Sequence, residues 1–70
     1  MYLVIEIQTQ NGKVSTLNYQ YDDIRLAEQK YYLILSAATV STIDIHAVMI
    51  VDPRGTVLKN DYYEHNKGEN

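Results

Sequence analysis

The chain of 70 residues contains no cysteine, no phenylalanine and no tryptophan, and only one proline and three glycines. Without cysteine it can form neither a disulfide nor a metal site with thiolate ligands. Its two histidines, His46 and His65, are too few for a structural zinc site built from histidine alone. A domain of this length buries only about 60% of the surface that its unfolded chain exposes, so its core gives little net stability. Small domains are usually stabilised by disulfides, by a metal ion or by association with another chain, and of these only association remains.

Long apolar runs and clusters of like charge are also missing. No stretch approaches the roughly 18 apolar residues needed to span a membrane, and the start, MYLVIEIQ, lacks the positively charged region of a signal peptide. The formal net charge is −3 and the six basic residues are scattered, which argues against binding to nucleic acid through phosphate neutralisation. We therefore expect a soluble intracellular protein that binds neither nucleic acid nor membrane.

Motifs for catalysis or cofactor binding are absent as well. The sequence contains no serine or cysteine nucleophile with a nearby base, no glycine-rich phosphate loop and no metal-ligand spacing. The adjacent carboxylates Asp22 and Asp23 serve better as a helix cap than as an acid–base pair. We expect no enzymatic activity, no metal and no cofactor.

The first third of the chain has the pattern of a β-hairpin. Residues 2–8 alternate, so that the odd-numbered residues form an apolar face and the even-numbered residues a second face with a glutamate in it. The pair Asn11-Gly12 accepts positive φ at both central positions of a type I′ turn and is the strongest hairpin signal in the sequence. A second strand should run over residues 14–21.

A helix and a second hairpin follow. In YDDI, at residues 21–24, an aspartate can cap the free amides of a helix, which should continue to about residue 40 because the segment lacks glycine and proline. Residues 47–51 are almost wholly apolar, as expected of a strand covered on both faces. Residues 52–55, DPRG, form a favourable turn with the glycine in the left-handed position, and a strand should follow over residues 56–63.

The order ββαββ predicts an α+β fold, with a four-stranded antiparallel sheet and one helix packed on one face. A single domain would cover residues 1–64. Residues 65–70 form a polar tail that we expect to fray. The first and third strands are the most apolar, so they are predicted to be central.

The predicted helix is apolar on two sides. At about 100° per residue, one side forms an ordinary core stripe of Ile24, Ala27, Tyr31, Ile34, Leu35 and Ala38. We place a second stripe on the opposite side, and we predict that it is an oligomer interface formed by Leu26, Lys30, Leu33, Ala37 and Val40.

The second stripe is predicted to pack against the same stripe of a second copy. Burial of its aliphatic side chains, at ~1.5–3 kcal/mol each, is comparable with the stability of a whole small domain. The alternative is that they are singly exposed apolar residues, which are common on protein surfaces. The uncovered face of the sheet offers a further contact, through Tyr2, Val4, Val48 and Ile50 or the residues that alternate with them. We thus expect a homodimer or a higher oligomer, and a tetramer if both surfaces are used.

Seven tyrosines, with no phenylalanine or tryptophan, are an unusual aromatic choice. A tyrosine combines a flat apolar ring with a hydroxyl group, which suits the rim of a small core. The functional alternative is a platform on which a base or another planar ligand stacks, with help from arginine. The candidate ligand-binding residues are Tyr19, Tyr21, Arg25, Tyr32, His46, Arg54 and Tyr63.

The two histidines have different expected environments. His46 lies at the start of the third strand beside Asp44, and a structural, hydrogen-bonded histidine is expected there in preference to a ligand-binding or proton-transferring one. His65, in the polar sequence YYEHNK, is expected to be solvated.

The segments YDDIRLAEQKYYLILSAATVS, IHAVMIVDPRG and YYEH carry a set of short motifs that extends over most of the chain. In these motifs the chain resembles a group of very small proteins encoded by phages and prophages of gut Firmicutes. The group has the pair YD at the start of its helix, A-E-x-K-Y within the helix and A-A-x-V-S at the helix end. A histidine before an apolar strand, a D-x-x-G turn and a Y-x-H motif near the C-terminus follow. The chain departs from the pattern at Tyr32, where a histidine is frequent, and at Thr39, where alanine is expected. The matching residues are Tyr21, Asp22, Ala27, Glu28, Lys30, Tyr31, Ala37, Ala38, Val40, Ser41, His46, Asp52, Gly55, Tyr63 and His65.

The resemblance implies a phage-type accessory protein in the cytoplasm of a bacterial host. Phages carry small oligomeric proteins that trap nucleotide-derived immune signals, and this chain is similar to them in size and in its expected oligomeric state. One expectation is therefore a counter-defence protein that sequesters a small nucleotide-derived ligand between subunits. The alternatives are an inhibitor or adaptor that binds a host protein, and a structural oligomer without a specific ligand.

Overall fold

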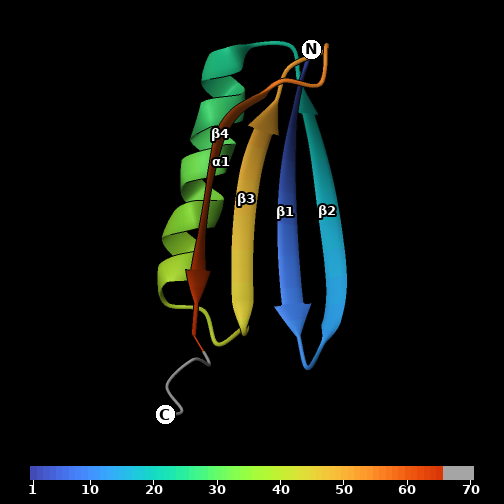
Figure 1. Ribbon diagram of the computed structural model, residues 1–70. Helices are drawn as coiled ribbons and strands as arrows, with labels where there is room; N and C mark the ends of the chain where they lie inside the picture. The colour runs from blue at the N-terminus through green and yellow to red at the C-terminus, as the bar shows by residue number, and fades with distance from the viewer. Residues whose placement is uncertain (66–70) are drawn as a thin grey trace.

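The computed structural model describes residues 1–65, which form one antiparallel sheet of four strands with one helix along a face of the sheet (Figure 1). The strands are β1 (Tyr2–Gln10), β2 (Lys13–Tyr21), β3 (Ile45–Val51) and β4 (Val57–Glu64), and the helix is α1 (Ile24–Thr39). The strand order β2-β1-β3-β4 places the first and third strands at the centre. The predicted ββαββ fold and its two central strands are confirmed.

The first hairpin closes through the predicted type I′ turn. Asn11 and Gly12 have φ values of 54° and 78°, which a glycine and an asparagine adopt at little cost. Gln10 pairs with Lys13 on either side of the turn. Because the pairing continues to this point, β1 is two residues longer than the alternation predicted.

Capping decides where α1 begins. The backbone amide of Arg25 donates to the side chain of Asp23 at 2.9 Å, so that Asp23, the second of the two proposed caps, is the N-cap residue. The helix ends at Thr39, and the amide of Val40 turns back to the carbonyl of Ala37. Within residues 1–65, no helix is long and apolar enough to cross a membrane.

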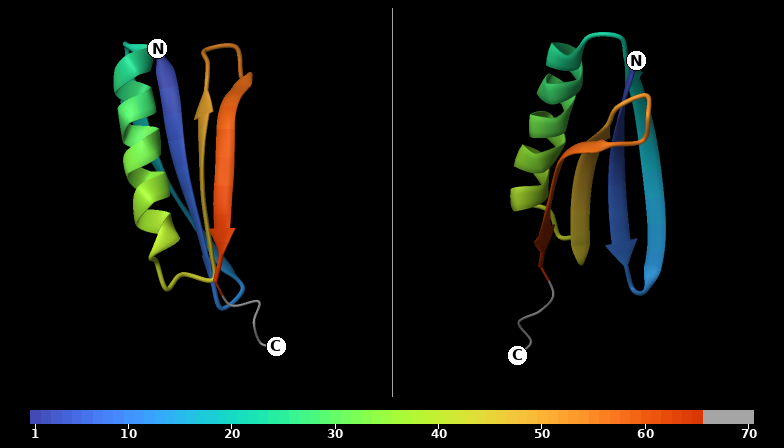
Figure 2. Two further views of the ribbon diagram at one scale, coloured as in Figure 1. Left: turned by 90° about the vertical axis from the view of Figure 1, so that its left-hand side faces the viewer. Right: turned by 45° about the horizontal axis from the view of Figure 1, so that its top comes forward.

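The core lies between α1 and the two central strands (Figure 2). Even-numbered residues of β1 and β3 point toward the helix, and their odd-numbered neighbours point to the other face of the sheet. The prediction that β3 is covered on both faces is wrong for a single chain, since Ala47, Met49 and Val51 are only half-buried. The buried apolar residues are Val4, Ala27, Tyr31, Ile34, Ala38, Val48 and Ile50.

The face of the sheet away from α1 is apolar at its centre and nearly free of charge. The sequence left open which of two alternating sets of residues lies on this face. In the structure Val4, Val48 and Ile50 point toward α1, and the residues that alternate with them lie on the open face. Uncharged polar side chains of β2 and β4 flank them, and Glu64 is the acidic residue at one corner. The central residues of this face are Leu3, Ile5, Ile7, Ala47, Met49 and Val51.

The end of the described chain is held by hydrogen bonds. The amide of His65 donates to the carbonyl of Asp44 at 2.7 Å, and its Nε2 lies 2.6 Å from the carbonyl oxygen of Ala38 at the end of α1. The ring also stacks on Tyr63. His65 is exposed, as expected, although these contacts tie it to the end of α1 and to the residue before β3. The rest of the predicted tail, residues 66–70, lies outside the described residues.

The turn between β3 and β4 depends on the carboxylate of Asp52. The pKa of this carboxyl lies below its ordinary value of 3.8, chiefly because the amide of Thr56 donates to it at 2.8 Å and also because the amide and guanidinium of Arg54 donate to it. Gly55, at φ 89°, closes the turn as predicted by donating its amide to the carbonyl of Asp52.

We predict that Asp52→Asn lowers the free energy of unfolding at pH 7, and that the difference from the wild type shrinks as the pH falls from about 4 to 2. A carboxyl with a lower pKa in the folded state stabilises the fold above its unfolded pKa, and this contribution is lost as the pH falls through the folded pKa. Urea unfolding of both chains across this range measures it. Asp61→Asn, at an exposed carboxylate bonded to the next amide, is the control. A difference that stays constant with pH would contradict the prediction.

Candidate functional site

The second apolar stripe of α1 is exposed, but it does not lie opposite the core. Leu33 and Val40 retain 64% and 83% of their accessible surface. Leu26 and Leu33 each directly precede a buried residue, Ala27 and Ile34. Since one residue corresponds to about 100°, the stripe lies on a flank of the helix and not on its back. The sequence-based placement on the opposite side is thus wrong. In a single chain the stripe is exposed except for the half-buried Lys30, and its role as an oligomer interface stays a prediction.

This flank faces β2. The ammonium group of Lys30 lies 4.2 Å from the centre of the Tyr19 ring, within the range of a cation–π contact. Beside this contact is a hollow of about 160 Å³, which we call the β2-flank hollow. It is lined by Tyr21, Leu26, Gln29, Lys30 and Leu33.

The other flank of α1 carries a second lysine–tyrosine contact, toward β4. The ammonium of Lys59 lies 5.8 Å from the centre of the Tyr32 ring, and the hydroxyl of Tyr32 is the main cause that raises the pKa of Lys59. Tyr32 also makes an edge-to-face contact with the buried Tyr31, at 5.0 Å between ring centres. Burial raises the pKa of Tyr31, and Asp61 adds to this effect. The two flanks are therefore chemically alike, but the β2-flank hollow lies on one of them.

A hydrogen-bonded pair of ionisable side chains, Glu6 and His46, is buried between the sheet and the helix. Nε2 of His46 lies 2.6 Å from Oε2 of Glu6, to which the side chain of Gln8 also donates at 2.9 Å. Both members are largely buried, and Nδ1 of His46 has no hydrogen-bond partner among residues 1–65.

The sequence placed His46 beside the wrong carboxylate. Its partner is Glu6 from the neighbouring strand, while the carboxylate of Asp44 accepts from the amide of Asn11. The expectation of a structural, hydrogen-bonded histidine is supported. The sequence did contain a signal for this pair. Glu6 alternates onto the same face of its strand as the apolar Val4, and a glutamate on a buried face needs a hydrogen-bonding partner.

The candidate ligand-binding residues do not gather at one place in a single chain. Arg25 is paired with its neighbour Asp23, Arg54 with Asp52, and Tyr63 lies across from His46 on the helix side of the sheet. Tyr19 and Tyr21, by contrast, share the helix side of β2 with Lys30. Sequence reasoning assigned Lys30 to the oligomer interface and missed its contact with Tyr19.

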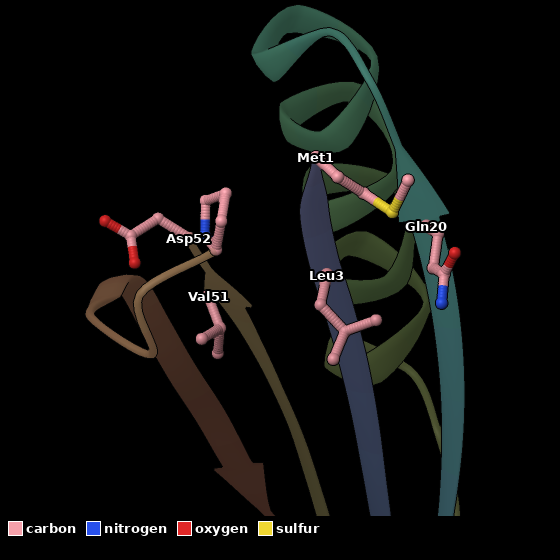
Figure 3. A pocket seen from close by; sticks show the side chains of 6 residues that line it. Met1, Leu3, Gln20, Val51 and Asp52 are labelled. Atoms are coloured by element: carbon pink, nitrogen blue, oxygen red, sulfur yellow. The ribbon is translucent and has the colours of Figure 1, made fainter.

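A larger hollow of about 300 Å³ lies at one end of the open sheet face (Figure 3). Figure 3 shows Leu3 and Val51 on neighbouring strands and the carboxylate of Asp52 turned away from them. This hollow contains no cationic side chain. We therefore regard it as part of the open apolar face and centre the candidate site on the β2-flank hollow. Its lining residues are Met1, Leu3, Gln20, Val51, Asp52 and Pro53.

No group of three or more histidine, aspartate or glutamate side chains suited to a metal ion occurs in the described part of the chain. Comparisons of the chain with protein-family models, with curated proteins and with solved structures give no match.

The buried Glu6–His46 pair yields a test of the packing below α1. We predict that His46→Leu and Glu6→Leu each lower the free energy of unfolding by about 3 kcal/mol or more, because each leaves one buried ionisable group without its partner. The double replacement should recover most of this loss, since two apolar side chains then meet. Urea unfolding of the four chains gives the coupling energy. Additive losses would show that the two side chains do not act as a pair.

Proposed function

We propose that the protein is a non-enzymatic accessory protein of the phage type, which holds a small, flat, anionic ligand such as a nucleotide derivative. The observation that carries this proposal is the position of Lys30, whose ammonium lies over Tyr19 at the β2-flank hollow. A cation held at a fixed place next to apolar and aromatic surface is the combination that an anionic planar ligand requires.

The lining of the hollow supplies one chemical function for each part of such a ligand. Lys30 can pair with a phosphate, the amide of Gln29 can donate to or accept from the edge of a base, and the ring of Tyr21 offers a face for stacking. Leu26 and Leu33 complete the site with apolar surface that loses water when the ligand binds.

The hollow of one chain is too small for this ligand. Its volume is about 160 Å³, whereas sites for small molecules usually enclose ~300–1,000 Å³. The proposal therefore places the ligand between subunits, where the surface of a second copy enlarges the hollow. Sequestration of an immune signal is the role that the phage-type resemblance suggests for such a site.

A second candidate function is an inhibitor or adaptor that binds a host protein. It is favoured by the edge of β2, whose nine residues have no neighbouring strand on one side. An extended segment of another protein can add to such an edge through backbone hydrogen bonds. The two functions are separated by whether a nucleotide or a polypeptide binds with defined stoichiometry.

Ligand binding is tested by calorimetry and thermal shift with cyclic nucleotides and ADP-ribose derivatives. We predict that Lys30→Gln weakens the binding of a recognised compound by about tenfold or more, since a charge-assisted contact contributes roughly 1.5–3 kcal/mol. Lys59→Gln is the matched control, because Lys59 also lies over a tyrosine ring but on the opposite flank. Absence of binding at high micromolar concentration, or equal losses in both variants, would contradict the proposal.

A further inference from the structure

We infer that a second copy of this chain docks along β2, so that the two β2 strands pair antiparallel about a two-fold axis at Leu17 and the two sheets become one sheet of eight strands. This inference goes beyond the proposed function, and it holds whether or not a ligand binds. It rests on the chemistry of the edge strand, on its register and on the position of α1.

The edge at β2 is not protected against strand addition. Seven of its nine residues are exposed, it contains no proline and no bulge, and Lys13 at one end is its only charged residue. Natural sheets usually protect such an edge with charges, proline, bulges or a covering segment. The edge at β4 is protected in this way, with an irregularity opposite Ile50 and Val51 and with Lys59 and Asp61 along the strand. Of the two edges of the sheet, β2 is therefore the one open to a partner (Figure 1).

The two-residue turn determines which backbone groups β2 leaves free. The pair that flanks such a turn, Gln10 and Lys13, exchanges both of its hydrogen bonds, and hydrogen-bonded pairs then recur at every second residue. The odd-numbered residues of β2 therefore bond to β1, and the even-numbered ones direct their amides and carbonyls to the free edge. These residues are Val14, Thr16, Asn18 and Gln20.

In one register, a second copy forms hydrogen bonds with all of the free backbone amides and carbonyls of β2. Leu17 is the middle residue of Lys13–Tyr21, so pairing about Leu17 uses the whole strand. Val14 then lies opposite the partner's Gln20 and Thr16 opposite the partner's Asn18, which gives about eight backbone hydrogen bonds. No two like charges face each other in this register.

Charge and apolar contact both favour a second copy as the occupant. In this register Lys13 lies opposite the partner's Tyr21, next to which the partner's Asp22 follows in sequence, so that the one charge of the strand comes near an opposite charge. Leu17, which retains 49% of its accessible surface in one chain, meets the partner's Leu17 in a close, non-hydrogen-bonded pair. The strand is therefore complementary to itself in reverse direction.

The dimer would also place the two helices on the same face of the joined sheet, because a two-fold axis perpendicular to a sheet preserves its faces. Each α1 packs over β1 and β3, so about four strand spacings, or roughly 19 Å, separate the two helix axes. Helices in direct contact are about 8–10 Å apart. A trough therefore remains between them, with the two β2 strands as its floor and the two exposed stripes as its walls. The β2-flank hollows of the two copies open into this trough at its opposite ends, because Tyr21 lies opposite the partner's Lys13 and not opposite the partner's Tyr21.

The two-fold axis at Leu17 permits a charge-exchange experiment. We expect the wild-type chain to sediment as a dimer at micromolar concentration, and Leu17→Lys and Leu17→Glu each to sediment as folded monomers. Like charges placed opposite each other cost several kcal/mol, so the dissociation constant should rise on the order of 100-fold or more. An equimolar mixture of the two variants should restore the dimer. Far-ultraviolet circular dichroism verifies that both variants fold, and Asn60→Lys, on the protected edge, should leave the dimer unchanged.

Cross-linking tests the register independently of any change in stability. The chain has no cysteine, so Leu17→Cys can form only a disulfide between two copies. Residues directly opposite in an antiparallel pair are ~4.5–5.5 Å apart at Cα, within the range of a disulfide. Leu17→Cys should oxidise to a covalent dimer and Asn60→Cys should not. The inference would be overturned if the wild-type chain sediments as a monomer or if Leu17→Lys sediments as a dimer. Equal cross-linking at positions 17 and 60 would also overturn it. These outcomes count against the dimer even if a nucleotide binds. A polypeptide that binds this edge of a monomeric chain would assign the edge to another partner.

Discussion

The contact of α1 with the two central strands is the interaction on which the rest of the molecule depends. Ala27 and Ile34 of the helix pack against Val4, Val48 and Ile50, and these are five of the seven buried apolar residues of the described chain. A single layer of helix can cover only one face of a sheet. The same contact that forms the core therefore leaves the other face open, sets which flank of the helix points to β2, and exposes the edge of β2 itself.

The exposed surfaces differ in what they can recognise. The open sheet face is apolar and nearly free of charge, which suits contact over an area but gives little directional selectivity. The flank of α1 combines Lys30 with the rings of Tyr19 and Tyr21, so it can discriminate charge and shape. The edge of β2 presents backbone groups in a regular order, which select register and direction. The proposed ligand site and the proposed dimer use the second and third of these surfaces, and they meet at the same strand.

The tyrosines show why a site is harder to predict than a fold. As isolated residues in the sequence, all seven are equivalent candidates. In the structure, Tyr31 is buried in the core, Tyr32 contacts Lys59, and Tyr63 lies across from His46. Tyr19 and Tyr21 lie beside a hollow with a cation. The difference arises from contacts between residues that are distant in the sequence. Tyr19 and Lys30 are 11 positions apart, and Glu6 and His46 are 40 positions apart. A local sequence pattern cannot predict such contacts.

Local chemistry in the sequence determined the elements of this protein. The alternation of apolar residues, Asn11-Gly12 with its positive φ values, the cap at Asp23 and the turn at Gly55 each act over a few neighbouring residues, so each could be read directly and each is observed. Tertiary structure alone decided which face of β3 is covered, which carboxylate pairs with His46, and that the second stripe of α1 lies on a flank. These outcomes depend on how the helix is rotated and shifted over the sheet, and that placement is set by packing between segments distant in the chain.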